Sequence, residues 1–148
     1  MAAPFDPQAS TIRVTAVLQG LVRRRARLVL DTGASRTVLA PRLVEVIQAR
    51  PAGHVSPVPI MTAGGMASAE QVRLTSVSLQ GFTVGPVDVL CTPLPTQLGA
   101  AGLLGLDILR HFNVTLDFEH GELTLERFPT DRVKETIATY SAPPARAA

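Results

Sequence analysis

The feature that most constrains this chain is a series of short runs in which apolar and polar residues alternate, interrupted by glycine and proline. Residues 12–19 alternate in this way, and residues 113–118 and 122–125 do so on either side of a turn at His120-Gly121. A period of two places successive side chains on opposite faces of a half-buried strand. Many short strands joined by turns predict a mostly β protein, either a small barrel or a sandwich.

Between these runs the sequence predicts two short helices and further strands. Pro41 fits the first position of a helix that Pro51 would stop. A second helix of one or two turns is expected over residues 106–112. Apolar residues broken by glycines predict strands over 22–30, 37–39 and 55–90, and two prolines predict a loop over 91–101.

Composition limits the class of protein. A length of 148 residues suits one domain, and 46% apolar with 18% charged residues is typical of a globular chain. No uncharged apolar run approaches the ~20 residues of a membrane span, and residues 1–10 lack the features of a secretory signal. We therefore expect a cytoplasmic protein with one domain over 12–128, a flexible tail over 1–11 and a partly disordered extension over 129–148.

Charge and cysteine content indicate no unusual partner. The net charge is +2, so neither a nucleic acid nor a membrane is expected as a partner. Arg23, Arg24, Arg25 and Arg27 form a cluster that fits the solvated end of a β-hairpin, and the alternative is a site that steers an acidic partner. Cys91 is the single cysteine, so the fold has to be stable without a disulfide within the chain.

The strongest chemical signal lies where the apolar run Leu28-Val29-Leu30 meets Asp31-Thr32-Gly33-Ala34-Ser35. Small polar residues and glycine cannot continue the strand, so Asp31 lies at a strand-to-loop turn. Thr32 can hydrogen-bond locally, and Gly33 has no Cβ and lets another group approach. These features favour a positioned carboxylate, although the same residue types also form ordinary turns.

Three segments in this order resemble the retropepsin-like aspartic proteases. They are Leu-Val-Leu-Asp-Thr-Gly-Ala-Ser at 28–35, a glycine-tipped hairpin near 60–73, and Gly-Leu-Leu-Gly-Leu-Asp-Ile-Leu at 102–109. Residues 104–111 resemble the cellular members more than the viral ones, and they are similar to the protease-like domain of DNA-damage-inducible proteins and to bacterial aspartyl proteases. The resemblance implies a closed β-barrel with one or two short helices, one lobe per chain, in a two-fold homodimer.

The resemblance also implies roles for individual residues. Asp31 would be the catalytic carboxylate, and Thr32 would lock its loop to the partner's loop. Gly33 would bring its N–H close to the carboxylate, and Ala34 and Ser35 would complete the active-site loop. The substrate-binding flap would comprise Thr62, Ala63, Gly64, Gly65 and Met66, and the apolar support behind the loop would comprise Leu103, Leu104 and Gly105. No metal or organic cofactor is implied.

Proteases of this class use two carboxylates, whereas the chain contains one Asp-Thr-Gly. One ionised carboxylate activates water while its protonated neighbour donates to the substrate carbonyl. Asp88, Asp107 and Asp117 lie in no equivalent sequence, so the second carboxylate would be Asp31 of another copy. The sequence therefore predicts a homodimeric aspartic endopeptidase acting on polypeptides. Asp107 suits the start of a helix or the anchoring of a loop better than catalysis.

Other chemistry has weaker support. Cys91 and His111 suggest a thiol hydrolase, but Cys91 follows an apolar run that suits a buried structural cysteine. Neither these residues nor His54 and His120 match a metal-ligand spacing. Residues 99–105 lack the preceding strand and the lysine of a nucleotide-binding loop, and no Gly-x-Ser-x-Gly elbow is present.

The alternative to an enzyme is a catalytically silent dimerisation or peptide-binding module of the same fold. It is motivated by the absence of an aromatic residue from residues 61–69, where a flap would cover the site. Leu106 stands where many viral members carry a basic residue that helps to hold the dimer. Residues 129–140 either add a strand to the dimer interface or extend beyond the folded domain.

Overall fold

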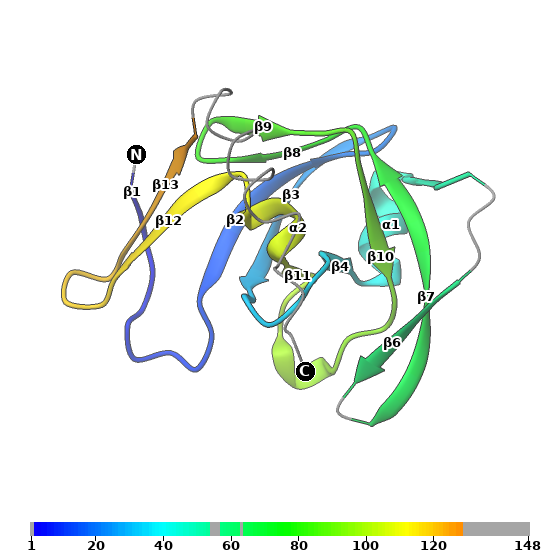
Figure 1. Ribbon diagram of the computed structural model, residues 1–148, viewed down its shortest axis with the longest axis horizontal. Helices are drawn as coiled ribbons and strands as arrows, with labels where there is room; N and C mark the ends of the chain where they lie inside the picture. The colour runs from blue at the N-terminus through cyan, green and yellow to red at the C-terminus, as the bar shows by residue number, and fades with distance from the viewer. Residues whose placement is uncertain (1, 54–56, 63, 129–148) are drawn as a thin grey trace, which may run out of the picture.

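The computed structural model describes residues 2–53, 57–62 and 64–128 (Figure 1). Strands dominate it, in agreement with the alternating pattern of the sequence. In chain order the elements are β1 (Ala2–Pro4), β2 (Arg13–Gln19), β3 (Arg23–Leu30), β4 (Val38–Leu39), α1 (Pro41–Ile47), β5 (Arg50–Pro51), β6 (Val58–Thr62), β7 (Gly65–Leu74), β8 (Ser76–Leu79), β9 (Phe82–Val84), β10 (Val87–Cys91), the 3₁₀ turn η1 (Thr96–Leu98), β11 (Gly102–Leu104), α2 (Leu106–Leu109), β12 (Phe112–Asp117) and β13 (Glu122–Arg127).

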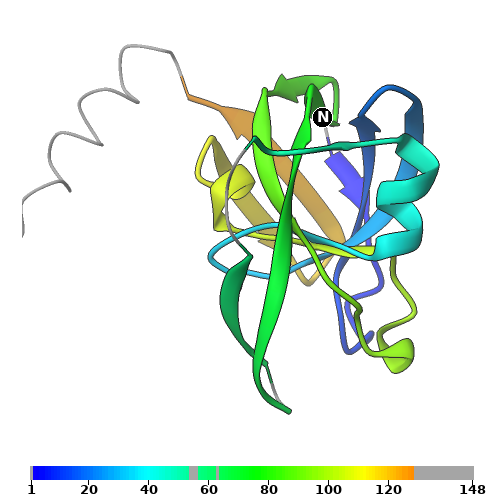
Figure 2. The same ribbon diagram turned by 90° about the vertical axis from the view of Figure 1, so that its right-hand side faces the viewer.

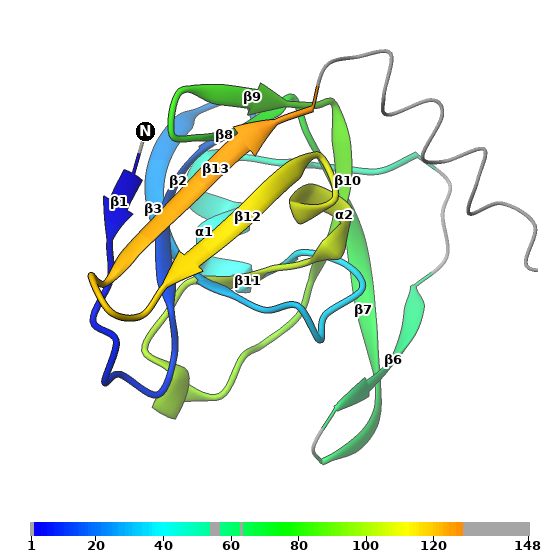
Figure 3. The same ribbon diagram turned by 60° about the vertical axis from the view of Figure 1, so that its left-hand side comes forward.

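Two sheets curl around a common core (Figures 1 and 3). In the larger sheet the hydrogen-bonded order is β5-β7-β10-β4-β11-β3-β2-β8-β9, with β6 paired to β7. The smaller sheet has the order β1-β13-β12. The predicted strands over 12–19 and 22–30 form the long antiparallel β2–β3 hairpin, and the predicted hairpin over 113–127 forms β12 and β13.

The main core is aliphatic because the chain has few aromatic residues. Alternate residues of β2 and β3, including Ala16, Leu18 and Leu28, are fully buried, and Val29 at the end of β3 is buried as well. Leu39 of β4 and Leu104 of β11 complete the layer and are also fully buried. Because β4 is antiparallel to β11 and β11 is parallel to β3, residues 31–37 form a loop between two strands that both pair with β11.

Three expectations about element boundaries are wrong. Residues 2–4 do not belong to a flexible tail, because they form β1 and pair with β13. The first helix ends at Ile47 rather than near Pro51, since the carbonyl oxygens of Ile47 and Gln48 accept hydrogen bonds from the N–H groups of Val22 and Leu21. The second helix ends at Leu109. The predicted extension over 129–148 lies outside the described residues.

No helix within the described ranges is long and apolar enough to span a membrane.

Candidate active site

Asp31 follows directly on β3, and its backbone is fixed by the neighbouring strand. Val29 and Leu30 lie beside Leu103 and Leu104 of β11 in the parallel ladder. The N–H of Asp31 continues this ladder and donates to the carbonyl oxygen of Leu104 at 3.0 Å. Asp31 as a whole residue is half-buried. Asp31 is therefore a partly accessible acidic residue whose backbone is fixed by the sheet.

The loop after Asp31 turns back on the carboxylate. The N–H of Gly33 donates to Oδ1 of Asp31 at 2.9 Å, and the N–H of Ala34 donates to the carbonyl oxygen of Asp31 at 3.2 Å. A Cβ on Gly33 would lie only 3.2 Å from Oδ1, so glycine permits this close approach. Thr32, Gly33 and Ser35 are exposed, so the predicted active-site loop presents its tip on the surface of the single chain.

Thr37 anchors the other end of this loop, and the sequence did not single it out. Its fully buried hydroxyl donates to Oδ1 of Asp107 at 2.7 Å and accepts the N–H of Gly105 at 3.0 Å. Its backbone N–H lies 2.9 Å from both carboxylate oxygens of Asp107. Asp107 therefore anchors the loop, as the sequence predicted. The sequence gives no local sign of this role, because the two partners, Asp107 and Gly105, lie 70 and 68 residues away from Thr37 along the chain.

Gly105 lies where the loop passes over the start of α2. A Cβ there would come within 2.6 Å of the carbonyl carbon of Arg36 and within 2.8 Å of the carbonyl oxygen of Ala34. Both neighbours are backbone atoms, so a side chain would displace the loop. Among the predicted support residues, Leu104 is fully buried in the main core, whereas Leu103 is half-buried and belongs to a second, smaller cluster.

The second cluster connects the Asp31 loop with the β6–β7 hairpin. Val38 and Leu103, from strands that flank the loop, pack with Val58 and Ile60 of β6 and with Ala69 of β7. The loop and the hairpin project on the same side of the molecule (Figures 1 and 3). An apolar floor therefore lies between the carboxylate loop and the base of the hairpin.

The hairpin has different inner and outer faces. Ile60 and Ala67 are cross-strand partners and half-buried, whereas the next pair, Met61 and Met66, is 77% and 66% exposed. Gly65 has φ +111°, a conformation that suits glycine at the tip. The predicted flap residues thus lie at the end of a projecting hairpin (Figure 2), with Ala63 outside the described residues.

The other aspartates considered from the sequence have partners elsewhere. Asp88 forms an ion pair with Arg73 at 2.7 Å, and the hydrogen bond from Arg73 lowers the pKa of Asp88. Asp117 accepts the N–H of His120 at 3.0 Å, which contributes to lowering the pKa of Asp117. With Asp107 bound to Thr37, none of these three carboxylates lies with Asp31 in a common hydrogen-bond network among the described residues.

The structure does not favour the thiol hydrolase or the metal site that the sequence also raised. Burial raises the pKa of the Cys91 thiol, with a smaller contribution from Glu70, which is the opposite of what a nucleophilic thiolate requires. Burial lowers the pKa of His111. No group of three histidine, cysteine or acidic residues in the described parts of the chain could hold a metal ion.

Two solved structures of aspartic proteases share this fold. A retropepsin-like aspartic protease from Rickettsia conorii aligns with a TM-score of 0.64 and 18% identity, over 84% of this chain and 88% of the other. The EIAV protease, solved with the inhibitor HBY-793, aligns with a TM-score of 0.54 and 18% identity, over 70% of this chain and 88% of the other. At these identities the likeness establishes the retropepsin-like fold.

Sequence comparison assigns the chain to a family, which the structural likeness alone does not. A search of the curated proteins finds no match. The family model of the aspartyl proteases matches residues 14–108, a segment that runs from β2 through the Asp31 loop and the hairpin into α2. The match covers more than half of the chain and includes the predicted catalytic carboxylate. The chain therefore belongs to the aspartyl protease family.

Proposed function

We propose that this protein is a homodimeric aspartic endopeptidase in which two Asp31 carboxylates, one from each chain, activate water. The observation that carries the proposal is the placement of Asp31, a partly accessible carboxylate held by the β3–β11 ladder and by the N–H of Gly33. The tip of its loop is exposed, so a second copy can approach it. A two-fold axis beside this loop would bring the two carboxylates together.

The chemistry follows from sharing one proton between the two acids. Two carboxyl groups at hydrogen-bond distance cannot both ionise easily, so one remains protonated. The ionised Asp31 removes a proton from water as the water oxygen attacks the peptide carbonyl carbon. The protonated Asp31 donates to the carbonyl oxygen, and the tetrahedral intermediate collapses when the leaving nitrogen is protonated.

The floor beside the loop favours an extended substrate with apolar residues near the cleaved bond. Half-buried Ile60 and Leu103 offer aliphatic surface on the side of the molecule where the Asp31 loop lies. A peptide in extended conformation would place alternate side chains against this surface while its backbone pairs with strand edges. Specificity would thus come from aliphatic contacts rather than from charges.

Cleavage of a diverse peptide library, read by mass spectrometry between about pH 4 and pH 7, tests the proposal. We expect cuts flanked by apolar residues, and no cuts by the Asp31→Asn variant. Turnover by purified Asp31→Asn would contradict the assignment.

A silent peptide-binding module of the same fold is the second candidate. It is favoured by the hairpin, because its large side chains, Met61 and Met66, are exposed while its inner face carries Ile60 and Ala67. Binding of library peptides by a folded wild-type dimer without any product would support this module and exclude the protease.

A further inference from the structure

The outer face of β3 carries a row of arginines that lies outside the candidate active site. Arg23, Arg25 and Arg27 alternate along the strand and are exposed, whereas Ala26 and Leu28 between and beyond them are buried. Their cross-strand partners on β2 are uncharged: Gln19, Val17 and Thr15. No carboxylate forms an ion pair with any of these arginines in the described ranges. Like charges on one face repel each other, so the row leaves positive charge that a negatively charged partner would neutralise.

The edge of β3 next to this row is only partly occupied. Strand β11 pairs with Val29 and Leu30, and the N–H of Ala101 reaches the carbonyl oxygen of Arg27 at 3.3 Å. Backbone groups two residues apart in a strand point to the same edge. Arg25, two residues before Arg27, has no backbone partner on that edge within the described parts of the chain. The sheet therefore ends in an open edge position at Arg25.

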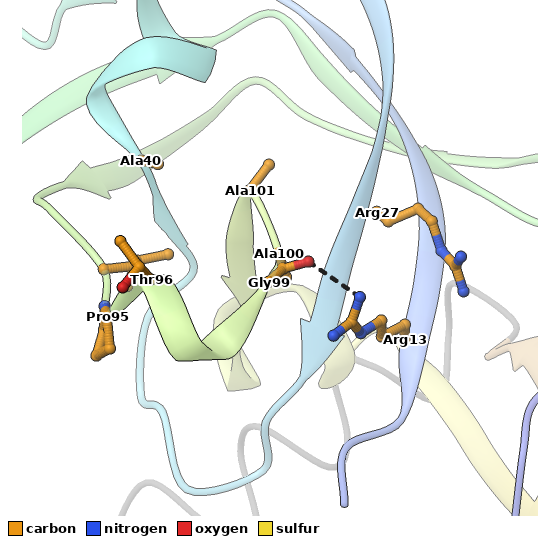
Figure 4. Close-up of a pocket in the computed structure, with 9 residues that line it drawn as sticks. Arg13, Arg27, Ala40, Pro95, Thr96, Gly99, Ala100 and Ala101 are labelled. Atoms are coloured by element: carbon orange, nitrogen blue, oxygen red, sulfur yellow. Dashed lines mark hydrogen bonds between the residues drawn. The ribbon is translucent and has the colours of Figure 1, made fainter. Parts of the chain in front are cut away.

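Two adjacent hollows lie along this edge. One, of about 340 Å³, lies between β3 and α1, and the other, of about 410 Å³, lies between β3 and the loop that contains η1 (Figure 4). Both are lined by Ala40 and Ala101, so they adjoin each other, and together they are here called the β3 groove. Its floor and walls include apolar Leu43, Val46 and Leu94, and its basic residues are Arg13, Arg24, Arg25, Arg27 and Arg42.

We propose that the β3 groove binds an extended, acidic segment of a polypeptide in which acidic and apolar residues alternate. The backbone of such a segment can pair with the open edge at Arg25. Its carboxylates would lie along the row at Arg25 and Arg27, and its apolar side chains would face Leu43 and Val46 on α1. Period-two alternation is what places these two kinds of side chain on opposite faces.

The apolar wall and the open strand edge favour a polypeptide over a nucleic acid. Phosphate backbones are bound chiefly by basic side chains and do not require a free strand edge. Val46 of α1 lines the groove and is 44% exposed. A peptide side chain bound there would cover this apolar surface. The inference does not depend on turnover, because the groove shares no lining residue with the Asp31 loop.

Fluorescence anisotropy of the full chain tests this surface, with Asp31→Asn as the background so that no probe is cleaved. The probes are a labelled hexapeptide of alternating leucine and glutamate, its leucine–lysine counterpart and a single-stranded oligothymidine. We expect the acidic hexapeptide to bind and the lysine peptide to fail. Adding Arg25→Gln and Arg27→Gln should weaken binding about tenfold at low salt. Arg50→Gln, an exposed arginine on β5 outside the groove, should not weaken it.

Amide hydrogen exchange supplies a second readout. The acidic hexapeptide should slow exchange at Arg25, because only strand pairing covers its N–H. Circular dichroism would verify that each variant is folded. Absence of binding by the acidic hexapeptide, binding that Arg25→Gln with Arg27→Gln leaves unchanged, or tighter binding of oligothymidine through these arginines would each overturn the proposal.

Discussion

Thr37 is the residue on which the position of the Asp31 loop most depends. Its hydroxyl hydrogen-bonds both the N–H of Gly105 and the carboxylate of Asp107, and the residue is fully buried. A buried hydrogen-bond group that loses its partner destabilises a protein more than the bond itself would suggest. The loop therefore depends on a hydroxyl whose importance only the three-dimensional arrangement reveals.

Replacing this hydroxyl with a methyl group should test that role. We expect Thr37→Val to lower the free energy of unfolding by about 2 kcal/mol, since the N–H of Gly105 and the carboxylate of Asp107 lose a partner. Cleavage activity should fall as well, because the loop is no longer fixed. Urea unfolding measures the first effect, and Thr37→Ser, which keeps the hydroxyl, should remain close to the wild type. Equal loss in both variants would assign the role to packing instead.

Asp88 gives a residue-scale prediction for pH. Its hydrogen bond with Arg73 lowers its folded pKa below the ordinary value of 3.8. A lowered pKa stabilises the fold above that value, and the contribution disappears as the pH falls through the folded pKa. The melting temperature of the wild type should therefore exceed that of Asp88→Asn above pH 3.8, and the difference should shrink as the pH falls through the folded pKa. A difference that stays constant over this range would contradict the ion-pair explanation.

At the scale of elements, local patterns predicted the strands but not every pairing between them. Alternation along residues 12–19 identified β2 because the residues of its buried face recur at every second position within one short segment. Strand β1 was missed because Ala-Ala-Pro has no alternation, and it becomes a strand only by pairing with β13. The first helix was predicted too long because the partners of the carbonyl groups at its end, Leu21 and Val22, lie in the turn between β2 and β3, far from the helix in the sequence.

The hairpin of β6 and β7 offers a matched pair of substitutions on one strand. Ile60 faces the apolar floor and Met61 faces outward. If the hairpin covers substrate, Ile60→Ala should raise KM about fivefold, because aliphatic contact area is lost. Met61→Ala should leave KM unchanged. Steady-state kinetics on one library-derived peptide would compare them, and an equal effect of the two substitutions would exclude an inward-facing substrate contact.

For the whole molecule, the sequence predicted the retropepsin-like fold, which the structure has, and it predicted Asp31 as the catalytic carboxylate of a site shared by two chains. The prediction for Asp31 was possible because the strand, the Asp-Thr-Gly turn and the later Gly-Leu-Leu-Gly segment are all local patterns of the sequence. The absence of a second Asp-Thr-Gly from the chain is what led the sequence to predict the second carboxylate as Asp31 of another copy. The groove along β3 was beyond the sequence, since its walls come from α1, β3 and the η1 loop.

Subunit mixing tests the central claim, a catalytic pair shared between two chains, most directly. Equal amounts of wild type and Asp31→Asn would be allowed to exchange subunits at a concentration that maintains the dimer. Random pairing leaves about one quarter of the dimers fully wild type, so cleavage should fall to about half of the summed activity of the unmixed samples. Activity equal to that sum after complete exchange would show that each chain works alone, which would contradict the shared site.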